Sequence, residues 1–208
     1  MAIKDNREYR KAQLFECRAS ETKESYIVEG YATTFDDEYV LFEDPWDGTQ
    51  YKEKVMREAF DKDTDLSDVI FVKDHEGTVF ARTRNNTLSL ALDNHGLKVT
   101  VDLSKTASAR AMYEEIKEGM YDQMSFAFIV DKDEYDKETH TRSITHIQKL
   151  FDVSAVSFPA NPNTDIGTAT RDYFNGVIEA ERAERLAQEQ SLKEVRERYY
   201  AERNKNGN

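Results

Sequence analysis

Apolar and polar side chains alternate most clearly in residues 88–103, LSLALDNHGLKVTVDL. Leucine occupies every second position of the first half, and apolar residues keep the same period from Leu97 to Leu103. Because successive side chains of a strand point to opposite faces, each half is expected to form a strand with one buried and one solvated face. The segment NHG at 94–96 contains residues that tolerate positive φ, so the pattern predicts a β-hairpin.

Short apolar runs elsewhere predict further strands, and two segments are expected to be helical. The expected strands lie within 13–42, 69–72, 79–81, 123–130 and 142–158. Ser104 is positioned as the N-cap of a helix over about 106–118, which Gly119 ends, and 55–62 is expected to form a short helix. Polar loops are expected at 43–50 and 131–141.

The two ends of the chain differ from its middle in composition and in hydrophobic periodicity. Residues 177–208 are rich in Glu, Arg, Ala, Gln and Lys, which favours a helix, and their opposite charges balance. Their apolar stripe is thin, so we expect a charged helical tail that binds a partner or stays solvated. The first residues are charged and aperiodic, which predicts a flexible leader over 1–12 and one folded domain over 13–176.

Charge and composition exclude several classes of protein. The formal net charge of −12 argues against a sequence-independent nucleic-acid binder and against docking on an anionic membrane. No apolar stretch approaches the length of a membrane span, and the N-terminus lacks the apolar core of a signal peptide. The single cysteine, Cys17, makes no intramolecular disulfide and is expected to be a packed core thiol. The four histidines lack metal-site spacing, and neither a P-loop nor a dinucleotide fingerprint appears, so we expect neither a metal nor a cofactor.

His75 is the first candidate for chemistry. It follows the apolar run at 69–72 closely and precedes Gly77 by two positions. A side chain at the end of a buried strand is held rigidly and can still meet a substrate. The alternative, which the local pattern alone favours, is a loop histidine between two strands.

Ser125 is the second candidate, in the segment DQMSFAF at 122–128. In a strand, Met124, Phe126 and Phe128 would share the core face, and Ser125 would point to the other face. The serine is therefore expected to face outward or into a groove rather than to be buried. The local sequence lacks a G-x-S-x-G motif, which disfavours an α/β-hydrolase, and a structural strand serine stays open.

Asp152 is the third candidate, within the apolar strand LFDVSAVSF at 150–158. An unpaired buried carboxylate costs free energy, so this aspartate needs a partner, and an imidazole N–H would serve. The alternative is a strand aspartate that reaches water.

Taken in order, these segments resemble the prohead maturation proteases of tailed bacteriophages. The resemblance covers about residues 22–168, and MSFAF and DVSAVSFPANP are its most specific parts. The matching segments are EGYAT at 29–33, MREAF at 56–60, DHEG at 74–77, NHGLKV at 94–99, AxxMYEEIKEG at 109–119, MSFAF at 124–128 and LFDVSAVSFPANPNT at 150–164.

The resemblance implies a serine endopeptidase that trims capsid and scaffold protein inside the immature head, in the host bacterial cytoplasm. It also implies a compact, mostly antiparallel β-barrel flanked by helices, related to the herpesvirus capsid-assembly proteases. The expected partners are the major capsid protein with its scaffolding segment, and a second copy of the chain for self-association. The tail at 177–208 is expected to bind the scaffold or capsid protein or to be removed by self-cleavage. A catalytically silent assembly factor with the same fold is the alternative.

Carried over by position, Ser125 matches the nucleophile and His75 the general base, while Asp152 matches the third member. His146 lies on the same strand face as Asp152 and is the alternative third member, because the herpesvirus relatives use a second histidine. The chain departs from the family pattern near the serine and near the MREAF segment, where Met124 and Glu58 replace glycines. His75 is followed by glutamate, where members usually have aspartate.

Overall fold

The computed structural model describes residues 7–16, 18–19, 26–157 and 168–205. Cys17 lies outside the described residues, and the core thiol stays a prediction. The chain divides into two compact units, residues 1–167 and 168–208. The strands of the first unit are β1 (Glu8–Glu16), β2 (Arg18–Ala19), β3 (Ile27–Thr34), β4 (Tyr39–Glu43), β5 (Gln50–Val55), β6 (Ile70–Lys73), β7 (Glu76–Arg82), β8 (Leu88–Leu92), β9 (Gly96–Asp102), β10 (Gln123–Asp136) and β11 (Thr141–Val156). The first unit also holds the helix α1 (Ala107–Lys117) and two 3₁₀ turns, Arg57–Ala59 and Thr83–Asn85.

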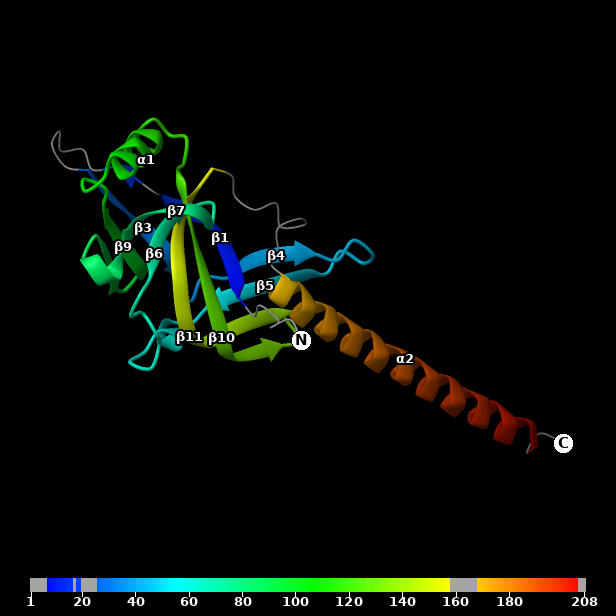
Figure 1. The fold of residues 1–208 in the computed structure, drawn as a ribbon. Helices are drawn as coiled ribbons and strands as arrows, with labels where there is room; N and C mark the ends of the chain where they lie inside the picture. Colours follow the sequence, from blue (N-terminus) through cyan, green and yellow to red (C-terminus); the bar gives the residue numbers. More distant parts are fainter. Residues whose placement is uncertain (1–6, 17, 20–25, 158–167, 206–208) are drawn as a thin grey trace, which may run out of the picture. The chain divides into compact units, whose positions relative to one another are not determined.

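The strands form two sheets rather than the predicted barrel (Figure 1). The seven-stranded sheet runs β1-β10-β11-β5-β4, with β6 and β7 branching from β11, and the second sheet runs β2-β3-β9-β8. Because β1 and β4 end the path without pairing to each other, the described strands leave the barrel open, and that prediction is wrong. The α+β class is confirmed, and β11 adds parallel pairs with β5 and β6 to the otherwise antiparallel pairing.

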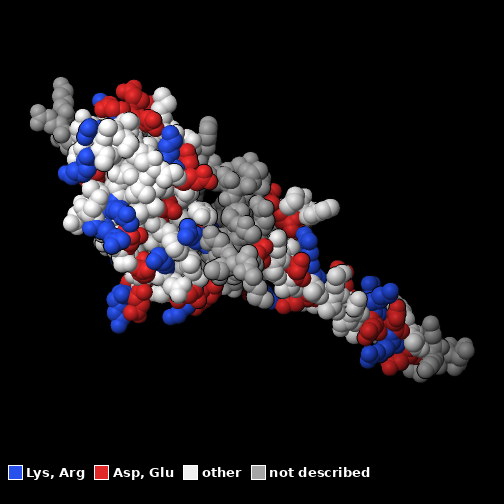
Figure 2. All heavy atoms as spheres, in the orientation of Figure 1, with Lys and Arg blue, Asp and Glu red and all other residues white. Residues whose placement is uncertain are grey.

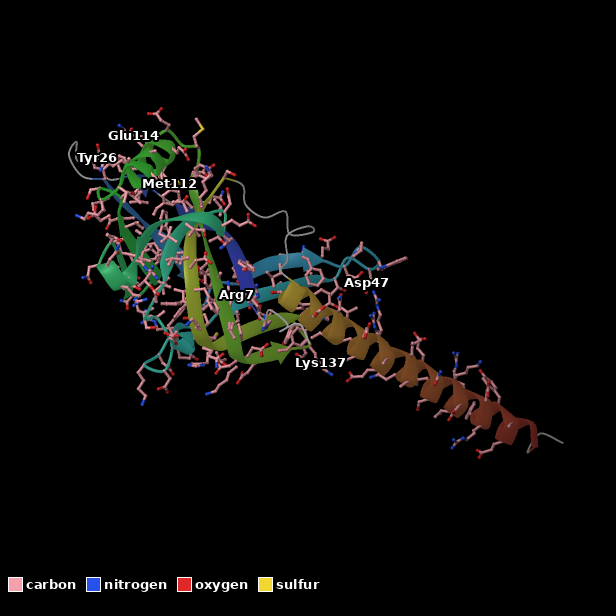
Figure 3. The ribbon with its side chains drawn as sticks, viewed as in Figure 1. Arg7, Tyr26, Asp47, Met112, Glu114 and Lys137 are labelled. Carbon is pink, nitrogen blue, oxygen red and sulfur yellow. The ribbon has the colours of Figure 1, made fainter. Side chains whose placement is uncertain are left out.

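The core is filled by apolar faces of both sheets and of α1. Val99 and Val101 of β9, Phe126 and Phe128 of β10, and Met112 of α1 are buried in one cluster. The alternation predicted for the second half of the 88–103 hairpin is confirmed, since β9 buries every second residue. Helix α1 is also confirmed, and it turns Met112 inward and Glu114 to solvent (Figure 3).

Several local predictions differ from the structure at their ends. The N-cap of α1 is Thr106 rather than Ser104, and its side chain accepts the Ala109 N–H. The expected helix at 55–62 is only the 3₁₀ turn at 57–59. The sequence predicts a loop over 131–141, yet β10 continues to Asp136 and pairs with β11 as far as Thr141. An ion pair across the hairpin supports this extension, because Arg142 Nε donates to Asp133 Oδ2 over 2.6 Å.

The second unit contains the helix α2 (Thr168–Lys205), which starts nine residues before the predicted tail. Glycine at 176 led the sequence pattern to place the helix start too late, although one helical glycine costs only about 1 kcal/mol. Residues of both charge signs alternate along α2 (Figure 2). Neither described helix is long and apolar enough to cross a membrane.

Candidate active site

His75 sits in the tight turn that joins β6 to β7. Lys73 pairs with Glu76, which leaves Asp74 and His75 as a two-residue loop. Both have positive φ, at 48° and 61°, as the first and second loop residues of a type I′ hairpin do. The loop is tied to β11, because the Asp74 N–H donates to the Ala155 carbonyl over 3.1 Å. The His75 ring therefore has a fixed base at the end of a buried strand.

Two neighbouring strands bring Ser125 and Asp152 to this ring. Ser125 lies in β10 opposite Ser154 of β11, and Asp152 lies opposite Ala127. The His75 Nε2 is 2.6 Å from the Ser125 Oγ, and the Nδ1 is 2.7 Å from the Asp152 Oδ1. Since a carboxylate only accepts hydrogen bonds, the Nδ1 carries the hydrogen of the second contact. The structure thus brings together the three residues that the sequence singled out.

All three side chains are almost shielded from solvent. Ser125 is fully buried, and the side chains of His75 and Asp152 are 9% and 8% exposed. The expectation that Ser125 faces outward or into a groove is therefore wrong. The alternation within β10 is real, but β1 pairs with its outer edge and places Lys11 opposite Ser125. An alternating pattern predicts which face of the strand a side chain is on. It does not predict whether a strand from elsewhere in the sequence will cover that side chain.

Ser154 is a polar neighbour of this group that the sequence reasoning did not single out. Its Oγ donates to the Asp152 Oδ1 over 2.8 Å and accepts the His75 backbone N–H over 3.2 Å. It is fully buried, and it lies two residues after Asp152, on the same strand face. This two-residue spacing from an aspartate in an apolar strand could have identified Ser154 from the sequence as a neighbour of Asp152.

Strand β1 contacts both Ser125 and His75 directly. The Ser125 hydroxyl lies 2.6 Å from the Arg10 carbonyl oxygen. The Tyr9 ring meets the His75 ring edge to face, with the ring centroids 4.8 Å apart. This strand begins at Glu8, inside the segment that the sequence pattern predicted to be a flexible leader.

A buried cluster of charges holds β1 in place. The Arg10 guanidinium pairs with Glu53 of β5 and with Glu8, and Arg142 of β11 donates to the Glu8 Oε2 over 2.8 Å. Burial raises the pKa of Glu8, but the charges and hydrogen bonds of the two arginines outweigh it and hold the pKa at about 2. Glu8 is thus ionised at neutral pH. A buried pair of this kind leaves an uncompensated charge when one partner is removed.

The other histidines lie in other surroundings. His146 Nδ1 contacts the Asp131 carboxylate, and Nε2 is 3.2 Å from the Asp61 Oδ1. The hydrogen bond and charge of Asp131 raise the pKa of His146. Of the two candidates for third member, Asp152 is therefore the one whose polar atoms contact the His75 ring. The part of the chain with described side chains contains no group of three or more His, Cys, Asp or Glu side chains arranged to hold a metal ion.

Comparison with known proteins adds one match. A family model described as caudovirus prohead serine protease matches residues 13–176. No curated protein and no solved structure matches the chain. The matched range contains all three candidate residues and their neighbour Ser154.

Proposed function

Because the chain belongs to the caudovirus prohead serine protease family, we propose that it is an endopeptidase that cuts capsid and scaffold protein, and itself, within the phage prohead. The family supplies the reaction class, that of a serine peptidase in head maturation. The observation that carries the proposal is the Ser125–His75–Asp152 chain of contacts, at 2.6 and 2.7 Å. The roles of these three residues belong to the proposal.

The proposed reaction follows the logic of a nucleophile, a base and an orienting carboxylate. The Ser125 Oγ attacks the scissile carbonyl carbon while His75 Nε2 takes the hydroxyl proton. Asp152 accepts the Nδ1–H, which fixes the ring orientation and stabilises the imidazolium. His75 then gives the proton to the leaving amine. Water attacks the acyl-enzyme in a second round, with His75 again as the base, and frees Ser125.

The test is co-expression of the chain with its capsid protein, followed by mass spectrometry of the capsid-protein termini. The wild-type chain is expected to produce new termini, and Ser125→Ala is expected to produce none. Ser89→Ala is the matched control, because Ser89 is an exposed strand serine of the other sheet. Capsid processing by a folded Ser125→Ala protein would contradict the assignment.

A serine-reactive probe separates the endopeptidase from a silent assembly factor. A fluorophosphonate is expected to label Ser125 of the wild-type chain and to leave the His75→Ala variant unlabelled. A silent factor would give neither label nor new termini, although it would still bind capsid protein. The two measurements together therefore distinguish a lost activity from an absent substrate.

The helix α2 is proposed to recruit the enzyme to its capsid or scaffold partner. Leu192, Val195 and Tyr199 are more than half exposed and are spaced for one helix face. We expect Leu192→Glu with Val195→Glu to lower processing in the prohead and to leave probe labelling unchanged. Glu194→Gln with Glu197→Gln is the control, because both are exposed and lie away from this face. Normal processing by the double glutamate variant would rule out recruitment through this face.

A further inference from the structure

The strand next to β10, which carries Ser125, is the terminal strand of its sheet. In the seven-stranded sheet, β10 has β11 on one side and β1 on the other, and β1 ends the sheet (Figure 1). The pairing is antiparallel, with Arg10 opposite Phe126 and Lys11 opposite Ser125. An extended peptide can add to such an edge through main-chain hydrogen bonds. Strand β1 therefore occupies the place that a peptide would take if it paired with β10.

The Arg10 carbonyl also lies where a substrate carbonyl must come. Its oxygen is 2.6 Å from the Ser125 Oγ, and attack requires a carbonyl carbon within about 3–3.5 Å of the nucleophile. A second peptide carbonyl has no room there while β1 stays. The Tyr9 ring, packed on His75, covers the base from the same strand.

The hydroxyl hydrogen of Ser125 has two competing acceptors in this arrangement. A hydroxyl has one hydrogen, and a carbonyl oxygen can only accept. When the hydrogen points to the Arg10 carbonyl, it is not directed at His75 Nε2 and cannot be transferred to that nitrogen. The β1 contact thus opposes the proton transfer that starts catalysis.

We infer that the edge of β10 at Ser125 is the enzyme's peptide-binding surface, that it takes an extended segment of the substrate chain, and that β1 occupies it until the substrate displaces this strand. The inference rests on the proposed protease function and deepens it. It makes β1 an intramolecular competitor of the substrate.

The buried charge cluster sets how firmly β1 holds this place. The Arg10 side chain pairs with Glu53, and Glu8 pairs with Arg142, so both anchors join β1 to strands of the same sheet. Just before β1, the Arg7 guanidinium lies over the Phe151 ring, 4.1 Å from its centroid. Substitution of the Arg10 side chain keeps its backbone carbonyl and removes the anchor. The buried Glu53 carboxylate keeps Arg142 and Tyr39 as partners. The fraction of molecules with β1 displaced then rises, and the observed rate at Ser125 rises in proportion.

The experiment measures the rate of fluorophosphonate labelling at Ser125 in the full chain. Arg10→Ala and the milder Glu8→Gln are compared with the wild type, and thermal melting checks that each variant is folded. Arg82→Ala is the control, since it breaks an arginine–carboxylate pair between Arg82 of β7 and Asp68, neither of which belongs to β1. We expect Arg10→Ala to label about tenfold faster than the wild type and Arg82→Ala to label at the wild-type rate.

A peptide added in trans tests the occupied place directly. The decapeptide REYRKAQLFE, the sequence of residues 7–16, is expected to slow the labelling of Arg10→Ala. A scrambled peptide of the same composition is expected to have no effect.

Each outcome decides the inference. Faster labelling of Arg10→Ala, or of Glu8→Gln where Arg10→Ala does not fold, supports it. Folded variants that label at the wild-type rate or more slowly would overturn the role of β1 and leave the protease function standing. No label at Ser125 in any variant would remove the protease function as well, and the inference with it.

Discussion

The Asp152 carboxylate accepts a hydrogen bond from the Ser154 hydroxyl over 2.8 Å, within the same strand. The same hydroxyl accepts the backbone N–H of His75, so Ser154 joins the carboxylate to the turn that carries the imidazole. Ser154 thereby connects Asp152 to His75, which lies far from it in sequence.

Ser154 is expected to be a positioning residue. A hydrogen bond to a charged group contributes about 1.5–3 kcal/mol, so Ser154→Ala should lower kcat about tenfold to a hundredfold. KM for a peptide substrate should stay unchanged, because Ser154 is buried behind Asp152 and His75. Ser154→Thr, which keeps the hydroxyl, should recover part of the loss. A fall in melting temperature with an unchanged kcat would show a purely structural serine.

Asp152 and His146 make different predictions as third members. Asp152→Asn should lower kcat by about 10³–10⁴, because an amide cannot stabilise the imidazolium or hold the same ring tautomer. His146→Gln is the matched variant, and it should retain near wild-type kcat because the His146 ring contacts Asp131 and Asp61. Steady-state kinetics on one peptide substrate compares the two. The reverse order of effects would transfer the third role to His146.

His146 should also make stability depend on pH near neutrality. Its pKa is raised above the ordinary value of 6.5, chiefly by the hydrogen bond to Asp131, so the folded state binds the proton more tightly than the unfolded state. This contribution is fully present below pH 6.5 and is lost as the pH rises through the folded-state pKa. Denaturant titrations of the wild type should show the decline, and His146→Gln should flatten it. An equal slope in both proteins would assign the decline to other groups.

The sequence predicted those parts of the site that a local pattern encodes. The 88–103 hairpin, α1 and the strands around Ser125 and Asp152 follow from period and capping signals, and their order along the chain suggested the family. The same local signals also placed His75 at a strand end. They did not reveal its positive φ, because the turn type follows from the register of Lys73 with Glu76.

The parts that were missed depend on contacts between distant segments. Strand β1 is polar in sequence, and its charged residues looked solvated. Glu8 and Arg10 are buried only because Glu53 and Arg142 arrive from β5 and β11 to pair with them. Burial of Ser125 follows from the same assembly. The barrel prediction failed for the same reason, since no local pattern shows which strands lie at the ends of a sheet.

Gly96 tests a second long-range requirement, at the start of β9. A Cβ built at this position would lie 2.0 Å from the Thr33 carbonyl oxygen of β3, although its φ is not in the left-handed region. The sequence assigned this glycine to turn geometry, whereas the structure requires it for close packing of two backbones. Because backbone atoms cannot move aside cheaply, Gly96→Ala should lower the free energy of unfolding by on the order of 3 kcal/mol or more.

Gly119, after the end of α1, provides the contrasting case. Its φ is +74°, and a Cβ there would meet nothing within 4 Å. Gly119→Ala should therefore cost only the left-handed backbone strain, about 1–2 kcal/mol. Urea denaturation of both variants measures the difference. Similar losses in the two would mean that β3 and β9 separate enough to admit a methyl group at Gly96, and the close approach of these strands would then be dispensable for folding.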